Sequence, residues 1–395
     1  MTVPATPPRT PAAVPAMASA PDIRDVDDLF PPADGVPLPP RPQRGRGAIA
    51  NPDPRFAAWT RTSVDDGWLR DDDTAPATEL FVDSAKRMLS HNDSPDLPFE
   101  QSLNPYRGCE HGCIYCYARP SHAFLGHSPG LDFETKLYHK PEAARLLRRE
   151  LTRPDYVCRP IAIGTNTDAW QPVERRLRIT RSVLELLLEL KHPAMLITKS
   201  ALIERDTDLL AAMAKENLVH AAISLTTLDR ELARRLEPRA SAPQARLAAI
   251  RALSGAGVPV MAMISPVIPG LTDHELEHLL AAARDAGAVA ASYSVLRLPH
   301  ELHGLFERWL AWHAPEKASR VMAILYDMRG GKANDPRFTH RMRGLGHFAD
   351  LLAQRFALHQ RRLGFPGMPA LDSSRFVGAR PKNDGAQTDQ QLDLF

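Results

Sequence analysis

The stretch Pro105-Tyr-Arg-Gly-Cys109-Glu-His-Gly-Cys113-Ile-Tyr-Cys116-Tyr117 holds three of the four cysteines of the chain within eight residues. Cys thiolates are the usual protein ligands of iron–sulfur clusters, and three of them on one loop can bind three corners of a cubane. Gly108 and Gly112 allow the tight turns that a bulky ligand requires. Because the loop has no fourth cysteine, one iron of such a cluster would remain open to another ligand.

Two other uses of these cysteines stay open at the level of sequence. Zinc could be bound by the three cysteines with a fourth ligand, for which the candidates are His111, His122, His127 and Cys158. Zinc sites usually pair two C-x-x-C units, which this spacing does not provide. The cysteines could also be purely structural. Cys158 comes just before a predicted strand, and we interpret it as a small buried apolar residue rather than a ligand.

Composition limits the classes of protein that need to be considered. The chain has 395 residues, 44% of them hydrophobic, which is enough for one large core or two ordinary ones. Lys and Arg number 49 against 47 Asp and Glu, so global charge does not indicate nucleic-acid binding and a local patch would be needed. No apolar run approaches the ~18–20 residues of a membrane span. No signal peptide is evident, and clustered cysteines favour a reducing compartment, so we expect a cytoplasmic protein.

The chain divides by composition into five parts. Of its 36 prolines, 12 fall in the first 42 residues, and we predict a disordered Pro-rich segment over residues 1–50. An irregular extension follows over 51–101. We expect the main domain over 102–298, a helical Arg-rich extension over 299–366, and a flexible tail over 367–395.

Strands alternate with amphipathic helices through the predicted main domain. We expect strands at 103–106, 161–165, 195–198, 219–225, 258–264 and 289–296, and helices at 141–151, 175–190, 206–216, 243–256 and 273–286. Six such units predict an α/β fold with a parallel sheet buried on both faces. A partial (β/α)6 TIM-like barrel fits best, with a doubly wound sheet as the alternative. In both folds, reactive groups belong at the carboxyl ends of the strands.

In this context the spacing C-x-x-x-C-x-aromatic-C, with Tyr115 at the aromatic position, resembles the signature of the radical S-adenosylmethionine (SAM) superfamily. The resemblance covers roughly residues 103–297. It implies a [4Fe–4S] cluster held by Cys109, Cys113 and Cys116, with SAM bound to the open iron. It also implies an external reductant, such as a flavodoxin or ferredoxin, and reductive cleavage of SAM to methionine and a 5′-deoxyadenosyl radical.

The same resemblance assigns SAM contacts to polar residues at the predicted strand ends. Thr165 or Asp168 would accept from the amino group of SAM, although Asp168 or Thr167 could instead cap a helix. Ser224 and Thr226 would contact the ribose or the carboxylate. Arg246 would bind the carboxylate, with a surface salt bridge as the alternative. The remaining assignments are Ile268 beside the adenine, Lys199 and Ser200 at a strand end, and Arg297 toward the substrate.

The order of the motifs resembles a narrower branch, related to spore photoproduct lyase and described as DNA-repair-photolyase-like. The motifs run Thr167-Asp-x-x-Gln171-Pro-x-Glu174, then Ile-Thr-Lys199-Ser, then Pro266-x-Ile-Pro-Gly270-x-x-Asp273. That lyase carries a hydrogen-donor cysteine at the end of the second strand, where this chain has Thr-Asn-Thr at 165–167. The same repair chemistry is therefore not expected here.

Two further features bear on partners. Residues 329–343 contain six basic side chains and Phe338, which could bind phosphates and stack on a base or form a solvated loop. The chain ends Gln391-Leu392-Asp393-Leu394-Phe395, which resembles the peptide that binds the bacterial sliding clamp, or it folds back on its own domain. The leading hypothesis is a radical SAM enzyme acting on nucleic acid. The alternatives are radical chemistry on a peptide or small metabolite, and a non-catalytic zinc-containing module that binds the clamp.

Overall fold

The computed structural model describes residues 42–58, 76–338 and 340–378. Most of the predicted Pro-rich segment and the clamp-like peptide from Gln391 to Phe395 lie outside the described residues. Within the described ranges, no helix has the length and apolar character needed to cross a membrane.

A seven-stranded sheet in the order β10-β9-β8-β7-β6-β3-β2 forms the centre of the fold. Six of its strands are parallel: β3 (Gln101–Leu103), β6 (Ile161–Ile163), β7 (Ala194–Thr198), β8 (Val219–Ser224), β9 (Val260–Val267) and β10 (Ala290–Val295). β2 (Leu89–His91) pairs antiparallel with β3 at one edge. Each parallel strand lies beside the next one in the chain, whereas a doubly wound sheet reverses its order at a switch point. The predicted partial barrel is therefore confirmed.

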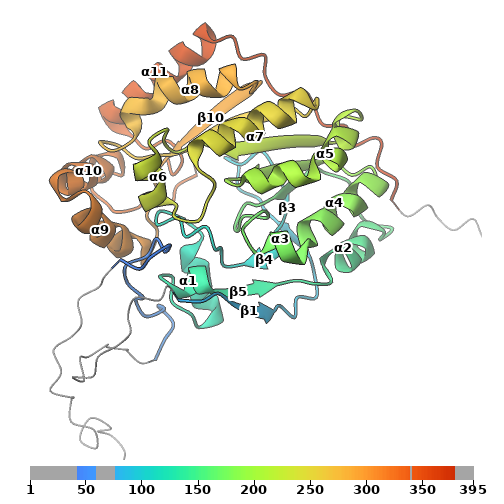
Figure 1. The fold of residues 1–395 in the computed structure, drawn as a ribbon, viewed down its shortest axis with the longest axis horizontal. Coiled ribbons are helices and arrows are strands. Elements are labelled where there is room, and N and C mark those ends of the chain that lie inside the picture. Colours follow the sequence, from blue (N-terminus) through green and yellow to red (C-terminus); the bar gives the residue numbers. More distant parts are fainter. Residues whose placement is uncertain (1–41, 59–75, 339, 379–395) are drawn as a thin grey trace, which may run out of the picture. The chain divides into compact units, whose positions relative to one another are not determined.

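Helices follow the strands around the outside of the sheet, as Figure 1 shows. They are α2 (Ala143–Leu151), α4 (Ile179–Glu189), α5 (Thr207–Ala214), α6 (Arg230–Leu236), α7 (Pro243–Gly255) and α8 (Leu276–Asp285). In α2 the buried residues Ala143, Leu146, Leu147 and Leu151 share one face, which is the spacing that places an amphipathic helix on a core. The predicted helix over 175–190 is divided, because Arg178 adopts a φ of 52° between α3 (Glu174–Leu177) and α4.

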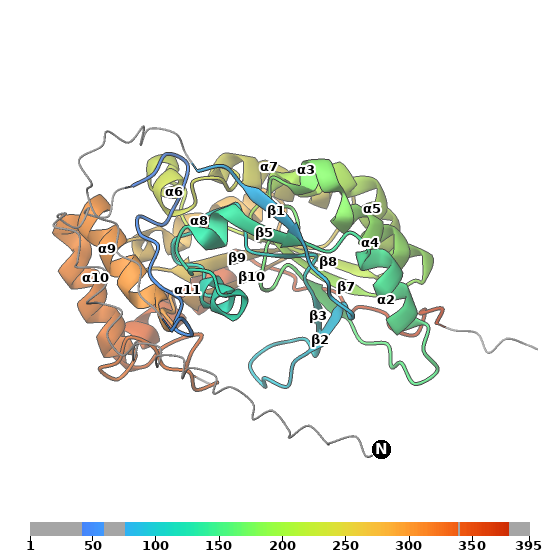
Figure 2. The same ribbon diagram turned by 90° about the horizontal axis from the view of Figure 1, so that it is seen from below.

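A second, three-stranded sheet was not predicted. It has the order β1-β5-β4, with β1 at Glu79–Val82, β5 at Lys136–His139 and β4 at Tyr106–Arg107. β1 and β5 lie side by side in Figure 2, and the short helix α1 (Asp132–Thr135) lies beside this sheet in Figure 1. The strand expected over 103–106 is consequently wrong as one element, because β3 and β4 belong to different sheets. The extension over 51–101 is likewise not irregular throughout, since it contains β1 and β2.

Two predicted boundaries also need correction. Arg46, Ala48 and Ile49 are buried, so the stretch expected to be disordered up to residue 50 is packed at its end. The part of the expected flexible tail that the structure describes, 367–378, is held by backbone hydrogen bonds from Gly367 to Val289 (2.8 Å) and from Val377 to Leu190 (2.8 Å). Before it come the helices α9 (Leu302–His313), α10 (Pro315–Met328) and α11 (Gly346–Arg362).

Candidate functional site

The three cysteines of the loop lie together after β4. Cys109 and Cys113 are buried and Cys116 is half-buried, packed against the apolar surroundings of both. Burial raises the pKa of the Cys109 thiol well above its usual value, and the neighbouring Asp168 and the two other thiols raise it further. Burial likewise raises the pKa of Cys113. The three thiols thus lie where burial disfavours their thiolate forms. A positively charged iron centre bound there would stabilise the thiolates.

The arrangement fits a cluster better than a single zinc ion. Within the described ranges, no three His, Cys, Asp or Glu side chains converge to hold one metal ion, as a zinc site requires. Ligands of a cubane do not converge in this way, because each thiolate binds a different iron. Cys158 is remote from the loop, beside Tyr156 and Ser373, so no fourth thiol is available. The donor set of Cys109, Cys113 and Cys116 therefore fits a three-cysteine cluster.

A buried arginine holds the loop from behind. Arg119 is fully buried and donates to the backbone carbonyls of Cys113 (2.8 Å), Gly112 (3.0 Å) and Gly130 (2.8 Å), and to the carboxylate of Glu134. Glu134 in turn accepts from the backbone of residues 47 and 48. The bonds to Cys113 and Gly112 fix the backbone that carries the cysteines, and the others connect it to neighbouring segments. Arg119 and Glu134 are therefore positioning residues that sequence reasoning missed.

The motif after β6 braces the same loop. Gln171 accepts from the backbone N–H of Glu110 (2.8 Å) and donates to the carbonyl of Gly108 (3.3 Å). Glu174 accepts from the Tyr106 hydroxyl and from the backbone N–H of Thr180 (3.1 Å). These contacts explain why glutamine and glutamate occur at this spacing.

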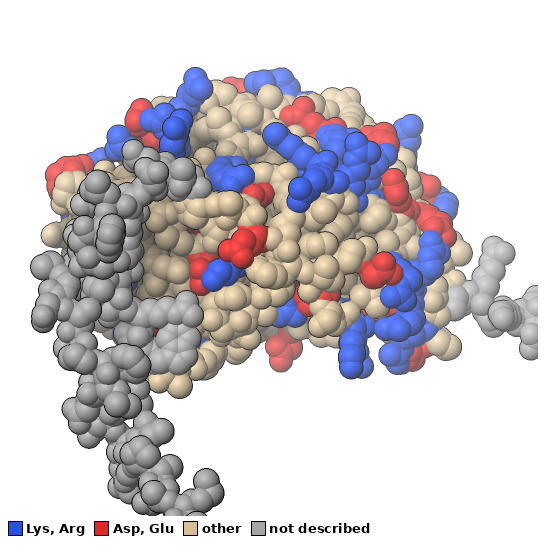
Figure 3. Space-filling model, turned by 60° about the horizontal axis from the view of Figure 1, so that its bottom comes forward, with Lys and Arg blue, Asp and Glu red and all other residues tan. Residues whose placement is uncertain are grey.

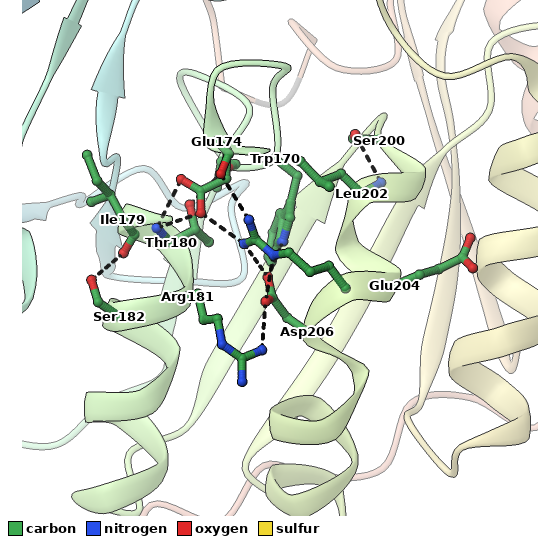
Figure 4. Close-up of polar contacts among 12 residues, drawn as sticks. Trp170, Glu174, Ile179, Thr180, Arg181, Ser182, Ser200, Leu202, Glu204 and Asp206 are labelled. Carbon is green, nitrogen blue, oxygen red and sulfur yellow. Dashed lines mark hydrogen bonds and ion pairs between the residues drawn. The ribbon is translucent and has the colours of Figure 1, made fainter. Parts of the chain in front are cut away.

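The end of the motif is anchored to the next strand–helix unit. Figure 4 shows Glu174, Thr180, Trp170 and Asp206 as one connected polar group. The indole of Trp170 donates to Asp206 (2.9 Å), and Arg205 donates to both Glu174 (2.9 Å) and Asp206 (2.8 Å). Two buried carboxylates thus share one guanidinium, which ties the segment after β6 to the segment after β7.

The contact of Asp168 with the amino group of SAM stays a prediction, but both of its carboxylate oxygens already accept from protein donors. One oxygen accepts from the Thr198 hydroxyl (2.7 Å) and the backbone N–H of Trp170 (2.8 Å). The other accepts from the backbone N–H of Lys199 (2.7 Å) and lies 3.3 Å from Nδ1 of His111. Burial alone would raise its pKa, but the adjacent His111 and these donors lower the pKa of Asp168 to about 2. Asp168 is therefore an ionised link between strand ends.

Thr226 and Arg246 also have protein partners. Glu237, which is 3% exposed, accepts from the hydroxyls of Tyr115 and Thr226 (2.8 Å from Thr226) and from the Arg246 guanidinium. Arg246 also donates to the carbonyls of Ser224 (3.0 Å) and Ser241 (2.7 Å). The alternative of a surface salt bridge for Arg246 is wrong, because its ion pair with Glu237 is buried. The contact with the SAM carboxylate stays a prediction. Tyr115 links the cysteine loop to the end of β8.

The other residues predicted to contact SAM differ in whether their polar groups already have partners within the protein. The backbone of Ile268 is used within its own turn, with Thr272 at 2.9 Å, and its side chain is fully buried in the core, so the contact with adenine stays a prediction. Thr165 accepts from the Tyr117 hydroxyl through its carbonyl. Ser224 is buried at the end of β8. Ser200 caps the turn after β7 by accepting from Leu202 (3.2 Å).

Two cations at the strand ends make no hydrogen bond from their side chains to any other residue that the structure describes. The ammonium of Lys199 lies 5.7 Å from the centroid of the Tyr115 ring. Its positive charge acts to lower the pKa of the Cys113 thiol, against the larger effect of burial. The guanidinium of Arg297 lies 4.7 Å from the centroid of the Tyr117 ring, and burial lowers the pKa of Arg297. These two groups remain for ligands that carry negative charge.

The basic stretch at 329–343 is largely occupied by contacts within the protein. Arg329 is buried and donates to the carbonyls of Leu296 (2.7 Å) and His340 (2.9 Å). Arg337 pairs with Asp335 (2.7 Å), and Arg341 pairs with Asp96. Arg343 lies over the Tyr293 ring at 3.7 Å. Phe338 remains exposed, so this stretch presents fewer free cations than its composition indicated.

Comparison with known proteins agrees with the site. The family described as Radical SAM superfamily matches residues 103–283. An uncharacterized protein of Mycobacterium tuberculosis is 41% identical over 230 residues, which cover 58% of this chain and 68% of the relative. An uncharacterized protein of Methanocaldococcus jannaschii is 26% identical over 202 residues, covering 50% of this chain and 71% of that protein.

Solved structures give partial overlaps. Spore photoproduct lyase with bound SAM and a dinucleoside spore photoproduct has a TM-score of 0.43 at 16% identity, covering 72% of this chain and 78% of that one. SuiB of Streptococcus suis bound to SAM has a TM-score of 0.28 at 16% identity, covering 41% and 35%. Overlaps of this size establish nothing about a substrate.

Proposed function

Because the chain belongs to the radical SAM superfamily, whose members use a [4Fe–4S] cluster and SAM, we propose that it cleaves SAM reductively at a cluster bound by Cys109, Cys113 and Cys116. The observation that supports this most directly is the cysteine loop itself. Three buried or half-buried thiols lie together on a backbone that Arg119 and Gln171 hold in place, with no fourth thiol near them.

The chain's own residues divide the work around that cluster. When bound, the cluster supplies one electron to SAM, which gives methionine and a 5′-deoxyadenosyl radical. The thiolates of Cys109, Cys113 and Cys116 would each bind one iron of the cluster. Lys199, whose ammonium has no hydrogen-bond partner in the described ranges, lies near Cys113 and Tyr115 and would bind the SAM carboxylate. The buried residues around the cysteine loop would exclude water.

For the substrate we propose a nucleic acid. Arg297 carries this proposal, because a half-buried guanidinium that stacks on Tyr117 and lacks a hydrogen-bond partner in the described ranges suits a phosphate group. Tyr117 is 47% exposed and offers a ring on which a base can stack. Radical chemistry on a peptide or small metabolite is the competing outcome. The reaction would take place in the cytoplasm.

Anaerobic reconstitution tests the cofactor proposal. Full-length protein given iron and sulfide should show an EPR signal after reduction with dithionite and should release 5′-deoxyadenosine from SAM. Cys116→Ala should abolish both, whereas Cys158→Ala is the matched control and should retain both. Bound zinc, no EPR signal and intact SAM would overturn the proposal in favour of a zinc-containing module.

The substrate proposal needs a separate readout. Arg297→Gln should weaken binding of a fluorescent single-stranded DNA or RNA by about tenfold, on the scale of one charge-assisted contact. Arg337→Gln is the matched control, because Arg337 is already paired with Asp335. Transfer of deuterium from a labelled oligonucleotide into 5′-deoxyadenosine would support the proposal. Transfer from a peptide instead would contradict it.

We also propose that the carboxyl-terminal peptide binds the sliding clamp. Its support is the sequence Gln391-Leu-Asp-Leu-Phe395, in which Leu394 and Phe395 would fill an apolar pocket. A synthetic peptide of the last ten residues should bind purified clamp, and a version with Leu394→Ala and Phe395→Ala should not. Equal binding of both peptides would contradict the proposal.

A further inference from the structure

A pocket of about 660 Å³ opens on the outer side of the cysteine loop. It is lined by segments that are far apart in sequence: residues 44–46, the stretch 76–80 that leads into β1, Glu110 of the cysteine loop, the loop and helix after β6, and the loop after α6. Its lining residues include four arginines and one acid, which are Arg44, Arg46, Arg176, Arg239 and Glu110. The pocket is therefore strongly basic, although the chain as a whole is nearly neutral.

The arginines of this pocket differ in whether their guanidinium groups already have partners within the protein. Arg46 is buried and donates to the carbonyls of Glu134 (2.9 Å) and Pro76, so it is structural. Arg239 is 34% exposed and lies 3.1 Å from Glu110, the one acid. Arg44 and Arg176 are exposed, and their side chains have no ion pair or hydrogen bond to another residue in the described ranges. Their charge is therefore presented outward.

The basic surface extends beyond the pocket. Arg175 and Arg178 are exposed beside Arg176 and likewise have no side-chain partner among the described residues. Figure 3, in which the side carrying β1 comes forward, shows a group of Lys and Arg side chains on this face. We call Arg44, Arg175, Arg176, Arg178 and Arg239 the basic patch. Exposed guanidinium groups spread over a surface suit a large acidic partner, whereas a small anion would need them to converge.

The position of the patch relates it to the cluster ligands. Glu110, which lines the pocket, is the residue directly after Cys109, and its backbone is held by Gln171. The thiols themselves lie on the buried side of the loop. SAM and the substrate would fill the barrel mouth during turnover. An electron donor therefore needs a second approach, and the outer side of the loop provides one within a residue of a cluster ligand.

From these observations we infer that the basic patch is the docking surface for a small acidic protein that donates one electron. The inference rests on the proposed function, because reductive cleavage of SAM consumes one electron per event. The electron passes from the reduced cofactor of the donor to the cluster, so the donor is oxidised by one electron and the cluster is reduced by one. No bond forms between the two proteins.

Charge reversal on the full-length protein tests the docking surface. The variant carries Arg44→Glu and Arg176→Glu, and the probe is an acidic flavodoxin in its fully reduced form. Binding is measured by surface plasmon resonance, and cluster reduction by stopped-flow absorbance. Both should fall by roughly tenfold or more at low salt, because electrostatic steering controls such encounters. The native protein should lose affinity as NaCl rises from about 50 to about 200 mM, and the variant should lose less.

A matched control carries Arg251→Glu and Arg320→Glu, which change the net charge equally at exposed arginines that have no side-chain partner in the described ranges. This control should bind and accept electrons like the native protein. Dithionite, which needs no docking, should reduce all three proteins at the same rate. A milder Arg44→Gln and Arg176→Gln variant keeps the test valid if charge reversal perturbs folding.

The outcomes separate this inference from the proposed function. If the patch variant and the control bind the flavodoxin equally, the docking surface is wrong, while dithionite-driven SAM cleavage leaves the proposed function intact. If dithionite yields no 5′-deoxyadenosine from the native protein, the proposed function fails whatever the binding data show. If the patch variant loses affinity for single-stranded DNA but not for flavodoxin, the patch serves nucleic acid and the inference is overturned.

Discussion

The two ends of the barrel are built differently, and the difference separates residues that hold the structure from residues left for ligands. At the carboxyl ends of the strands lie the cysteine loop and two cations without hydrogen-bond partners in the described ranges, Lys199 and Arg297. At the amino ends, residues 367–378 run past the starts of several strands and bond to Val289, Asn217 and Leu190. In TIM-like folds the functional face is the one at the carboxyl ends of the strands, where these two cations lie.

Loss of Arg119 should have the largest effect on the open end. Arg119→Met leaves four carbonyls and the buried Glu134 carboxylate without their donor. An uncompensated buried charge costs about 3–5 kcal/mol, so the free energy of unfolding should fall by that amount. The cysteine loop should also lose its geometry. Urea denaturation and the iron content after reconstitution measure the two effects.

The exposed Arg251 provides the control for this prediction. Arg251→Met should change neither stability nor iron content, because Arg251 has no side-chain partner in the described ranges. Full iron loading of Arg119→Met would show that the cluster itself shapes the loop and that the arginine is dispensable for it.

The closed end should respond to pH through His192. Nδ1 of His192 donates to the carbonyl of Pro193 (3.0 Å), and Nε2 lies 2.7 Å from the Tyr156 hydroxyl. Burial lowers the pKa of His192 to about 4. Below pH 6.5 the unfolded state therefore binds a proton that the folded state does not. Stability should fall by about 1.4 kcal/mol per pH unit, or about 3 kcal/mol by pH 4.

His192→Gln isolates this contribution. Between pH 6.5 and 4, the unfolding free energy of the variant should depend less steeply on pH, by the contribution of about one proton. Urea denaturation at each pH measures this slope. His122 at the open end, whose pKa burial also lowers to about 4, supplies a comparable share in both proteins. An unchanged slope would mean that His192 is protonated in the folded state.

The sequence predicted structure well where one hydrophobic pattern is repeated along the chain. It predicted poorly where residues far apart in sequence form a feature together. Apolar runs alternating with amphipathic helices predicted five of the six parallel strands, because burial on both faces of a sheet leaves a continuous pattern. The small second sheet was missed, since its strands have two to four residues and too little pattern to recognise.

The site shows the same division. The three cysteines were recognisable because their spacing is local. Asp168 at a strand end and Arg246 in the following helix were assigned to SAM by residue type and position, but whether a polar group is free depends on partners elsewhere in the chain. Glu237 is the partner that Tyr115, Thr226 and Arg246 share. It is 122 residues from Tyr115 in the sequence, and no local pattern indicates this contact. Counting hydrogen-bond partners in three dimensions is what separates Lys199 from Asp168.

That separation can be sharpened with Lys199→Met. If Lys199 binds the SAM carboxylate, its removal should raise KM for SAM by about 10- to 100-fold, on the scale of one hydrogen bond between charged groups. The fold should be unaffected, because the ammonium makes no hydrogen bond to another described residue. Steady-state release of 5′-deoxyadenosine under dithionite measures KM and kcat. A fall in kcat at unchanged KM would assign Lys199 to the cluster rather than to SAM.

Phe376 at the closed end should give the smallest effect and the cleanest contrast. Its ring meets those of Tyr156 and His192 edge to face, with centroids 5.6 and 5.1 Å apart. Because the ring is only partly buried, Phe376→Ala should lower the free energy of unfolding by about 1–2 kcal/mol. SAM cleavage should be unchanged, since the ring lies at the far end of the strands from the cysteines.

The matched control is Phe338→Ala, which removes a ring of the same size that is 45% exposed near the open end. This variant should leave stability nearly unchanged and should affect only substrate binding. Denaturation and 5′-deoxyadenosine release are measured on both variants. A ring of the closed end should affect stability, and a ring near the open end should affect substrate binding. Loss of SAM cleavage in Phe376→Ala, beyond what its unfolded fraction explains, would show that the closed end governs the geometry of the open one, and the division between them would then fail.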